Sequence, residues 1–479
     1  MSRASCYQFA ALVVGVFLVQ SSASAQSVPK RTFRAGAATS NITPPLGSPI
    51  IGGFAPFPAT HVHDELQARC LVLDDGTTRL AFVVCDLLGI NRLVSDEARA
   101  LIEKELKIPA ANVLISATHT HSAASALGKD ARMVSHTMDE YQRFVARRIV
   151  DGVKRAVNTL RPAQIGWGSV RVPEHVFNRR WFMKEGAIPP NPFGAIDKVR
   201  MNPPSGSADL VEPAGPTDPD VPFLSVREPD GKPISVLTTY SLHYVGGVGS
   251  GHISADYFGM YCETLAHLLK ADRQTPPFVA LLANGTSGDI NNISFRKPRG
   301  PKKPYEQMRY VAADVARKVH AALGKLEHRD GARLAALYRE PEIATRRPDQ
   351  EQLDWASKTI AERPAVPGKT DLTRIYAERT LSLAKNPAKL KLPLQLFRIG
   401  DAAIGTMPCE VFCEIGLEFK KRCPIQPAWL ISLNHGYYGY LPTPRHHKLG
   451  GYETWLGTNR MEVAASEKML AQLLEMAGE

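Results

Sequence analysis

Apolar and polar positions follow two periodicities along this chain, and each periodicity predicts one kind of element. Strict alternation is typical of a half-buried strand, and a short continuous apolar run is typical of a fully buried one. Strands are predicted at 66–75, 79–88, 112–119, 163–172, 233–242, 278–285, 392–400, 402–408 and 428–434. Apolar residues recurring every three to four positions predict helices at 94–106, 139–160, 257–270, 306–323 and 462–477.

The predicted strands and helices interleave along the whole chain. This order favours a mixed α/β fold, with layered mixed β-sheets flanked by helices in a single large domain, over a sandwich or a helical bundle. Two stretches interrupt the pattern. Residues 182–222 are rich in Pro, Gly and Asp, and a loop of that length is usually functional or mobile. Residues 341–390 are charged and weakly helical, and are predicted to form a peripheral helical insertion.

The first 25 residues have the pattern of a secretory signal peptide. Arg3 is followed by an apolar stretch from Phe9 to Val19 and by small residues that end at Ala25. The apolar stretch is far shorter than the roughly 20 residues that span a bilayer. We therefore expect cleavage before Gln26, a mature domain over 26–479, and a secreted or periplasmic location.

Composition and charge narrow the choice of partners. Hydrophobic residues make up 44% of the chain and charged residues 22%, which excludes a wholly disordered protein. The net charge is +11, and loss of Arg3 with the signal peptide leaves +10. Such a balance indicates either a solvated basic surface or peripheral contact with an anionic membrane surface. No zinc-finger spacing or basic helix indicates nucleic acid, so no nucleic-acid partner is expected.

Six cysteines remain after the predicted cleavage. Cys70, Cys85 and Cys262 lie inside apolar segments and are typical of small core residues. Cys409, Cys413 and Cys423 lie close together in the sequence, so one disulfide among them is an open alternative in an oxidising compartment.

The segment NVLISATHTHSAAS (112–125) places two histidines at the end of an apolar strand. Because successive strand residues alternate faces, His119 and His121 would project to the same side if the strand continued through Thr120. Two imidazoles on one face could bind a metal. The alternatives are that only one of them is a ligand, or that both lie on the surface. A second pair of this spacing, His61 and His63, lies in a loop and is a weaker metal candidate.

Other predicted strands also end in residues that can bind metal or carry out chemistry. His243 follows the strand at 233–242, and Glu410 follows the strand at 402–408. Asp289 and Asn291 lie in the loop after the strand at 278–285. Strand ends of layered α/β proteins converge on a crevice. Two histidines with a carboxylate match a catalytic zinc set, which keeps one position open.

Several short motifs, in order, resemble the neutral and alkaline (non-lysosomal) ceramidases in their amino-terminal catalytic domain. The motifs are GAATSNITPP (36–45), THTHS (118–122), FNRRW (177–181), SLHYV (241–245), MPCEVF (407–412), YYGYLPT (437–443) and MEVAAS (461–466). The resemblance covers almost the whole mature chain. It implies hydrolysis of the amide bond of an N-acyl sphingoid lipid with Zn²⁺ as cofactor. Because the sequence stops at Glu479, soon after MEVAAS, we expect it to lack the family's carboxy-terminal immunoglobulin-like domain.

The resemblance also implies roles for individual residues. His119, His243, Glu410 and Tyr440 would be the zinc ligands, although Tyr437 and Tyr438 compete with Tyr440 on sequence grounds. His121 would be an adjacent active-site residue, and Arg179 would face the substrate.

One position departs from the family pattern. Asn291 replaces the serine of the family's G-x-x-S-P-N segment, and an amide is not a nucleophile. We therefore expect direct hydrolysis by metal-activated water, with His121 carrying a proton and Arg179 or Asn291 stabilising the oxyanion. Asp256 and Asp289 are expected to orient the imidazoles. The alternatives are a hydrolase of a different amide or ester, such as an acylated envelope sugar, and a catalytically lapsed relative that binds a lipid or glycan.

Overall fold

All nine predicted strands are present in the computed structural model, with slightly shorter bounds. The model describes Met1, Ser2, Gln8 and residues 32–54, 56–128, 137–366 and 368–479, so the predicted signal peptide lies almost entirely outside the described residues. Residues 32–479 form one unit. The nine strands are β5 (Gln67–Asp74), β6 (Arg79–Cys85), β7 (Val113–Ala117), β9 (Gln164–Arg171), β15 (Pro233–Tyr240), β17 (Val279–Asn284), β22 (Leu394–Ile399), β23 (Ala402–Met407) and β25 (Ala428–Ser432).

The five predicted helices are also present. They are α1 (Arg92–Leu106), α2 (Glu140–Asn158), α3 (Asp256–Leu268), α4 (Glu306–Leu323) and α9 (Ala465–Ala477). Two helix starts are fixed by side chains that accept hydrogen bonds from backbone amides of the first turn. Asn91 caps α1, and Asp139 forms a reciprocal capping box with Gln142 at α2. The sequence pattern missed α7 (Cys413–Arg422) and the short α8 (Pro444–Leu449).

Three sheets share one order over four strands, and the first sheet has a fifth strand, β8 (Arg161–Pro162), at its edge. They run β7-β6-β5-β1-β8, β17-β15-β14-β9 and β25-β23-β22-β19, where β1 is Arg34–Asn41, β14 is Asp220–Arg227 and β19 is Leu334–Arg339. In each sheet a parallel pair is joined through a helix, namely β6-α1-β7, β15-α3-β17 and β23-α7-β25, and the other pairs are antiparallel. The mixed α/β fold with layered mixed sheets is thereby confirmed, and it contains a threefold recurrence of structure.

The sequence pattern missed four strands of these three sheets, and the residue types in β1 and β14 explain why. They are β1 (Arg34–Asn41), β8 (Arg161–Pro162), β14 (Asp220–Arg227) and β19 (Leu334–Arg339). The strand β1 is built of small residues because α2 packs directly on it. A Cβ at Gly36 would lie 2.1 Å from the carbonyl oxygen of Ala156. The start of β14 falls in the stretch 182–222, where Pro and Asp conceal the strand.

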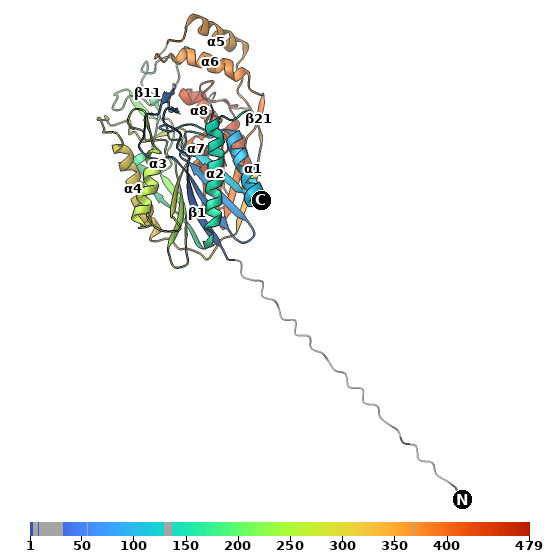
Figure 1. Ribbon diagram of the computed structural model, residues 1–479. Helices are drawn as coiled ribbons and strands as arrows, with labels where there is room; N and C mark the ends of the chain where they lie inside the picture. The colour runs from blue at the N-terminus through green and yellow to red at the C-terminus, as the bar shows by residue number, and fades with distance from the viewer. Residues whose placement is uncertain (3–7, 9–31, 55, 129–136, 367) are drawn as a thin grey trace. The chain divides into compact units, whose positions relative to one another are not determined.

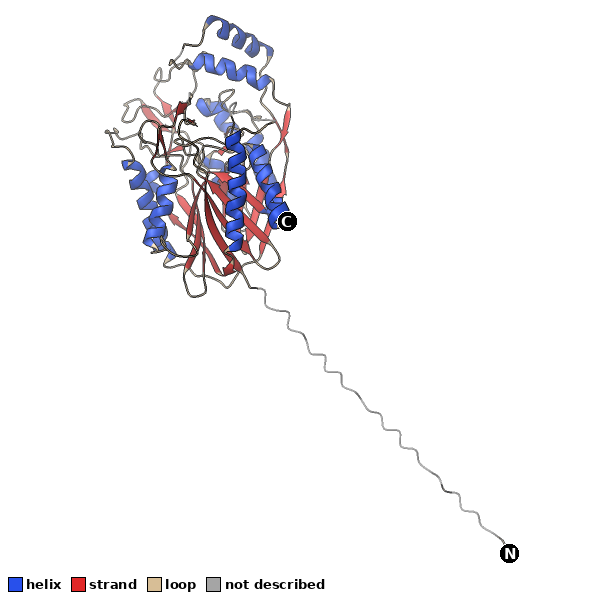
Figure 2. Cartoon of the chain, viewed as in Figure 1, coloured by secondary structure: helices blue, strands red, loops and turns tan. Residues whose placement is uncertain are grey.

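The inner faces of the three sheets share one buried core. Phe82 of β6 and Phe397 of β22 meet there, with ring centroids 5.0 Å apart. Helices cover the outer faces: α1 and α2 on the first sheet, α3 and α4 on the second, and α7 and α9 on the third. Figure 1 shows this layering, and Figure 2 shows the strands lying between the helices.

The two interrupting stretches are partly ordered as secondary structure. A three-stranded sheet joins β11 (Arg180–Met183), β12 (Arg200–Met201) and β13 (Leu210–Pro213). The stretch 341–390 contains α5 (Gln350–Glu362) and α6 (Leu372–Ala384), which lie together at the end of the domain near β11 and α8 (Figure 1). The remaining strands are two or three residues long: β2 (Pro49–Ile50), β3 (Phe57–Pro58), β4 (His61–Val62), β10 (Phe177–Asn178), β16 (His252–Ile253), β18 (Ile290–Asn291), β20 (Glu342–Ala344), β21 (Lys389–Lys391), β24 (Glu410–Val411) and β26 (Tyr440–Leu441).

The described cysteines are all buried and free, including Cys409, Cys413 and Cys423, so the structure contains no disulfide among those three. Within the described residues, no helix combines the length and the apolar character needed to cross a membrane.

Candidate metal centre and active-site cavity

The segment after β7 turns sharply, so His119 and His121 do not reach the same side by strand alternation. The strand ends at Ala117, and His119 has a φ of 69°, in the left-handed region that few side chains adopt. Its amide is nevertheless held, donating to the Leu87 carbonyl at 2.9 Å. The expected proximity of the two histidines holds, but a strained turn produces it.

Backbone carbonyls orient all three imidazoles. Nδ1 of His119 contacts the Leu88 carbonyl at 2.7 Å, and Nδ1 of His121 contacts the Gly52 carbonyl at 2.7 Å. Nδ1 of His243 contacts the Ser287 carbonyl at 3.0 Å. Because Nδ1 donates in each ring, each Nε2 carries the lone pair that a metal requires.

The three histidines form one cluster, with one ring nitrogen of each lying within 4.8 Å of the others. The Nε2 atoms of His119 and His121 are 3.1 Å apart. No comparable group of His, Cys, Asp and Glu occurs elsewhere in the described residues, so the structure offers no support for a metal at His61 and His63.

Asp256 and Asp289 do not orient the imidazoles as expected. Asp256 accepts the backbone amides of Val245 and Gly246, at 3.0 and 2.8 Å. Asp289 accepts the amide of Cys413 at 2.8 Å and the side-chain amide of Asn178 at 2.8 Å. Both carboxylates therefore fix the loops that carry the site, one step further from the metal centre than predicted.

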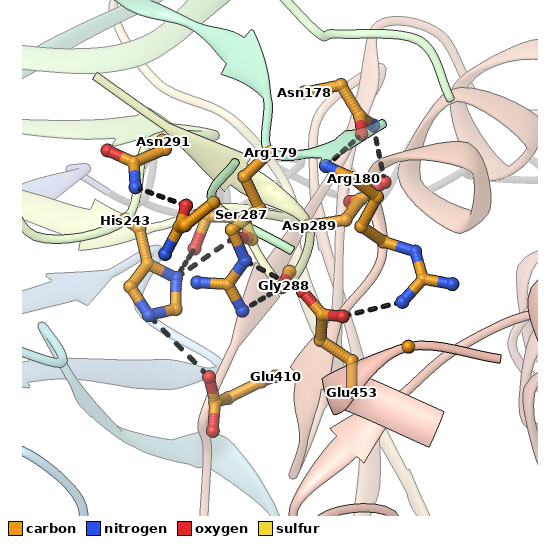
Figure 3. A network of polar contacts seen from close by, with 12 residues as sticks. Asn178, Arg179, Arg180, His243, Ser287, Gly288, Asp289, Asn291, Glu410 and Glu453 are labelled. Atoms are coloured by element: carbon orange, nitrogen blue, oxygen red, sulfur yellow. Dashed lines mark hydrogen bonds and ion pairs between the residues drawn. The ribbon is translucent and has the colours of Figure 1, made fainter. Parts of the chain in front are cut away.

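Glu410, in the short strand β24 that follows β23 of the third sheet, completes the cluster. Its Oε2 lies 3.2 Å from Nε2 of His119 and 3.7 Å from Nε2 of His243, and Figure 3 shows the His243 contact. Tyr437 donates its hydroxyl to Oε1 at 2.6 Å. Burial alone would raise the pKa of Glu410, but the neighbouring His119 and His243 hold it well below its usual range.

His121 and His243 are kept neutral by their surroundings. Burial, assisted by the neighbouring His119, lowers the pKa of His121 to about 3, and burial also holds the pKa of His243 well below its usual value. A neutral imidazole beside an ionised carboxylate is the protonation state of a metal-binding set.

Two buried polar atoms in this cluster have no hydrogen-bond partner. They are Nε2 of His243 and Oε2 of Glu410. A buried unsatisfied polar atom costs about 1–3 kcal/mol, so such a pair calls for an explanation. Both are metal-ligand atoms that face each other across 3.7 Å. The imidazole nitrogens and the carboxylate oxygen of this cluster are the kinds of ligand that zinc takes in proteins. The residues present therefore fit zinc.

Tyr437 and Tyr440 contact different partners. The hydroxyl of Tyr437 lies on the ligand carboxylate, whereas the ring of Tyr440 lies against Arg179, with 5.3 Å between the ring centroid and Cζ. Tyr440 as a metal ligand stays a prediction, and Tyr437 is the tyrosine whose hydroxyl touches Glu410.

Arg179 lies in the cavity wall and is firmly anchored. Its Nε donates to Glu453 at 2.9 Å and its Nη2 to the Gly288 carbonyl at 2.8 Å (Figure 3). Glu453 also pairs with Arg180, and all three side chains are buried. Burial alone would lower the pKa of Arg179, but Tyr440 and Glu453 raise it, so the guanidinium stays positively charged.

Asn291 does not itself line the cavity. Its amide donates to Asn202, a residue of the cavity lining, at 3.0 Å. The oxyanion role expected for Asn291 stays a prediction. Ser287 is buried, and its hydroxyl donates to Asn284 at 2.7 Å.

A cavity of about 550 Å³ opens onto the metal cluster. Its lining combines apolar and aromatic side chains with four arginines, the three histidines and Glu410. This is the usual size and character of a site for a small organic molecule. The α5–α6 stretch contributes Leu372 and Arg379 to the wall, so it is part of the site and not only peripheral.

The sequence model described as neutral/alkaline non-lysosomal ceramidase, N-terminal, matches residues 33–296. This chain belongs to that ceramidase family. The match includes His119, His121, Arg179 and His243, whereas Glu410 lies beyond it.

Individual relatives are distant. The neutral ceramidase of Pseudomonas aeruginosa is 21% identical over 413 residues, which cover 75% of this chain and 58% of that protein. This chain thus spans less than two thirds of the relative's length. A solved structure titled "Ceramidase complexed with C2" matches with a TM-score of 0.69 and 18% identity, covering 93% of this chain and 75% of the other. The crystal structure of the P. aeruginosa neutral ceramidase matches with a TM-score of 0.68 and 18% identity, covering 93% and 74%. At this identity the structural likeness shows the ceramidase fold.

Sequence reasoning missed several residues of the site. Glu453, Arg379 and Arg460 come from segments with no motif of their own. Glu453 is marked only by being an acid buried among basic and aromatic residues, and its burial cannot be read from the sequence.

Proposed function

We propose that this protein is a secreted or periplasmic, zinc-dependent hydrolase that cleaves the amide bond of a ceramide-like N-acyl lipid. Membership of the ceramidase family supports the reaction class. The observation that supports zinc is the pair of buried atoms without a hydrogen-bond partner, Nε2 of His243 and Oε2 of Glu410, in two residues that line the cavity.

His119, His243 and Glu410 would hold the metal, with a tyrosine hydroxyl beside them. Zinc bound there would polarise a carbonyl and lower the pKa of water from about 15.7 towards about 7. No serine nucleophile is then needed, which accommodates Asn291 at the family's serine position.

The remaining chemistry falls to side chains of the wall. His121 has its Nδ1 engaged by Gly52, so its Nε2 is the atom that accepts a proton and returns it to the leaving amine. Arg179, immobilised by Glu453 and Gly288, offers a fixed positive charge to the oxyanion that develops on the carbonyl.

The cavity lining supports an amphiphilic substrate. Apolar side chains such as Phe54, Leu127 and Trp455 suit a hydrocarbon chain, and the basic net charge suits peripheral contact with an anionic membrane surface.

The test is fatty-acid release from a short-chain ceramide by zinc-loaded mature protein, beside its His119→Ala variant. We expect release by the wild type and loss of both zinc and activity in the variant. A His119→Ala protein that keeps its zinc and its activity would disprove the metal assignment. A zinc-loaded wild type that releases no fatty acid would disprove the substrate assignment. Mass spectrometry of the protein recovered from culture medium or periplasm tests export, with Gln26 expected as the first residue.

A further inference from the structure

The side-chain amide of Asn291 belongs to a chain of three carboxamides. Asn292 donates its Nδ2 to the Val245 carbonyl at 3.2 Å and to Oδ1 of Asn291 at 3.3 Å. Asn291 in turn donates its Nδ2 to Oδ1 of Asn202 at 3.0 Å. The chain therefore connects the loop that follows His243 to Asn202, which lines the cavity.

The backbone carbonyl at one end fixes the direction of every hydrogen bond in this chain. A carbonyl oxygen only accepts, so Asn292 must turn its NH₂ group toward Val245. The same NH₂ group then requires the oxygen of Asn291 beside it. Asn291 is left with its own NH₂ group for Asn202, whose oxygen must face it. The NH₂ group of Asn202 remains, and no other described residue accepts a hydrogen bond from it.

The backbone holds Asn202 at the cavity in a conformation that suits an asparagine. Its φ is 47°, in the left-handed region, where asparagine is several-fold enriched among residues other than glycine. Its amide donates to the Arg179 carbonyl at 2.8 Å, beside the pairing of β11 with β12. The residue is exposed and lines the cavity. Its two remaining N–H donors are therefore available to a molecule in the cavity.

We propose that Asn202 is a substrate-binding residue that donates a hydrogen bond to an uncharged oxygen of the N-acylated substrate, and that Asn291 and Asn292 position it. The oxygen belongs either to the carbonyl of the scissile amide or to a hydroxyl of the amine part. The inference rests on the proposed amide hydrolysis and names a group that the site recognises. It also gives Asn291 a task at the position of the family's serine, since Asn291 directs an amide and attacks nothing.

Two variants of Asn202 remove the donors in different ways. Asn202→Asp keeps the shape of the side chain and the oxygen that accepts from Asn291, and aspartate also tolerates a positive φ. Asn202→Gly removes the side chain without adding charge and is unstrained at this φ. We expect kcat/KM to fall about fivefold or more in both, which is the usual effect of losing one hydrogen bond.

The control for the added charge is Asn386→Asp, at the turn after α6, which should stay within about twofold of the wild type. Full efficiency in both Asn202 variants, or a loss in only one of them, would overturn the proposal. A loss confined to Asn202→Asp would show charge repulsion, and a loss confined to Asn202→Gly would show that the donors are not needed.

A matched pair of substrates identifies the oxygen. N-octanoylethanolamine and N-propyloctanamide differ only by a hydroxyl group in place of a methyl group. An equal loss on both compounds in Asn202→Gly assigns the donor to the amide carbonyl. A loss confined to the ethanolamide assigns it to the hydroxyl.

Asn291→Asp tests the positioning role. Its carboxylate only accepts, so Asn202 must turn its NH₂ group toward that carboxylate and present its oxygen to the cavity. The substitution should reproduce the loss seen in Asn202→Gly although Asn202 is still in place. The double variant should lose no more than either single variant, because each removes the same donor. Additive losses, a fully active Asn291→Asp protein, or a loss of zinc in these variants would overturn the positioning role.

A binding measurement separates this inference from the proposed function. If the wild type hydrolyses both compounds and the variants match it, the inference alone fails. If the zinc-loaded wild type hydrolyses neither, the proposed function fails, and calorimetric titration with the same two compounds decides the donor. Binding that weakens about fivefold in Asn202→Gly and in Asn291→Asp supports it. Binding unchanged in the variants, or no binding by the wild type, overturns it.

Discussion

Glu453 holds Arg179 against the cavity wall through an Oε1 to Nε contact of 2.9 Å, although 274 positions separate the two residues in the chain. The same carboxylate pairs with Arg180. One fully buried acid thus fixes the direction of the guanidinium assigned to the oxyanion and also balances two buried charges.

Glu453→Gln should therefore reduce both stability and activity. Breaking a buried ion pair by changing one partner costs about 3–5 kcal/mol, and a displaced Arg179 should lower kcat/KM by about tenfold or more. Urea unfolding and ceramide hydrolysis measure the two effects, and zinc content should stay at the wild-type level. Glu475→Gln, which removes an exposed partner of Arg339, should change stability by less than about 1 kcal/mol. A Glu453→Gln protein as stable and active as the wild type would contradict the positioning role.

His121→Gln separates a proton carrier from a metal ligand. If His121 carries the proton, the variant should retain zinc while kcat falls by about 10²–10⁴-fold. Zinc content by atomic emission and kcat on the same samples provide the measurement, with exposed His267→Gln on α3 as the control. Loss of zinc together with activity would show instead that His121 is a ligand, as its 3.1 Å approach to His119 permits.

Two tyrosine variants distinguish the neighbours of the metal. Tyr437→Phe removes the hydroxyl that donates to Glu410 at 2.6 Å, so zinc affinity should weaken by about 10–100-fold. Tyr440→Phe should leave zinc affinity within about twofold of the wild type, because its ring lies against Arg179. Competition with a chromogenic chelator reports both affinities. A larger loss of zinc affinity in Tyr440→Phe than in Tyr437→Phe would show that Tyr440 is the ligand.

Asp256 should give stability a specific pH dependence. Burial raises its pKa to about 6, above the value of about 3.9 expected in the unfolded chain. The folded protein therefore binds more protons than the unfolded chain between about pH 4 and pH 6. The stabilising contribution is complete below about pH 4 and is lost as the pH rises through about 6.

The two-unit shift in pKa corresponds to about 3 kcal/mol. Relative to Asp256→Asn, the wild type should lose about that much unfolding free energy between pH 4 and pH 7. Difference curves from urea unfolding cancel the other titrating groups, including Asp86, whose pKa burial also raises to about 6. Asp272→Asn, at an exposed aspartate, is the control. A flat difference for Asp256→Asn would show that its pKa is not raised in the folded protein.

Periodicity predicted the elements that pack by their own amphipathic faces, and it failed where a neighbour dictates the residue types. The strand β1 carries no β-branched run because Gly36 must admit the backbone of α2. The shared strand order of the three sheets left no repeat in the sequence, because topology recurs without residue identity.

The residues of the candidate site also fall into those that the sequence reveals and those that it conceals. His119, His243 and Glu410 could be found because each follows a strand whose end is visible in the sequence. Glu453 and Arg379 could not, because their roles arise only when a short turn and a helix from distant parts of the chain meet at one cavity. The orientation of the imidazoles by backbone carbonyls was equally hidden, since a carbonyl has no sequence signature.

The threefold recurrence has a consequence for how the domain unfolds. His119 follows strand β7 of the first sheet, His243 follows β15 of the second, and Glu410 follows β23 of the third, so an ion bound between them would be shared by segments that all three sheets position. Opening any one sheet releases the ion, and its binding free energy is then added to the cost of each separate local opening. Metal occupancy should therefore merge the opening of three otherwise separable layers into a single cooperative event.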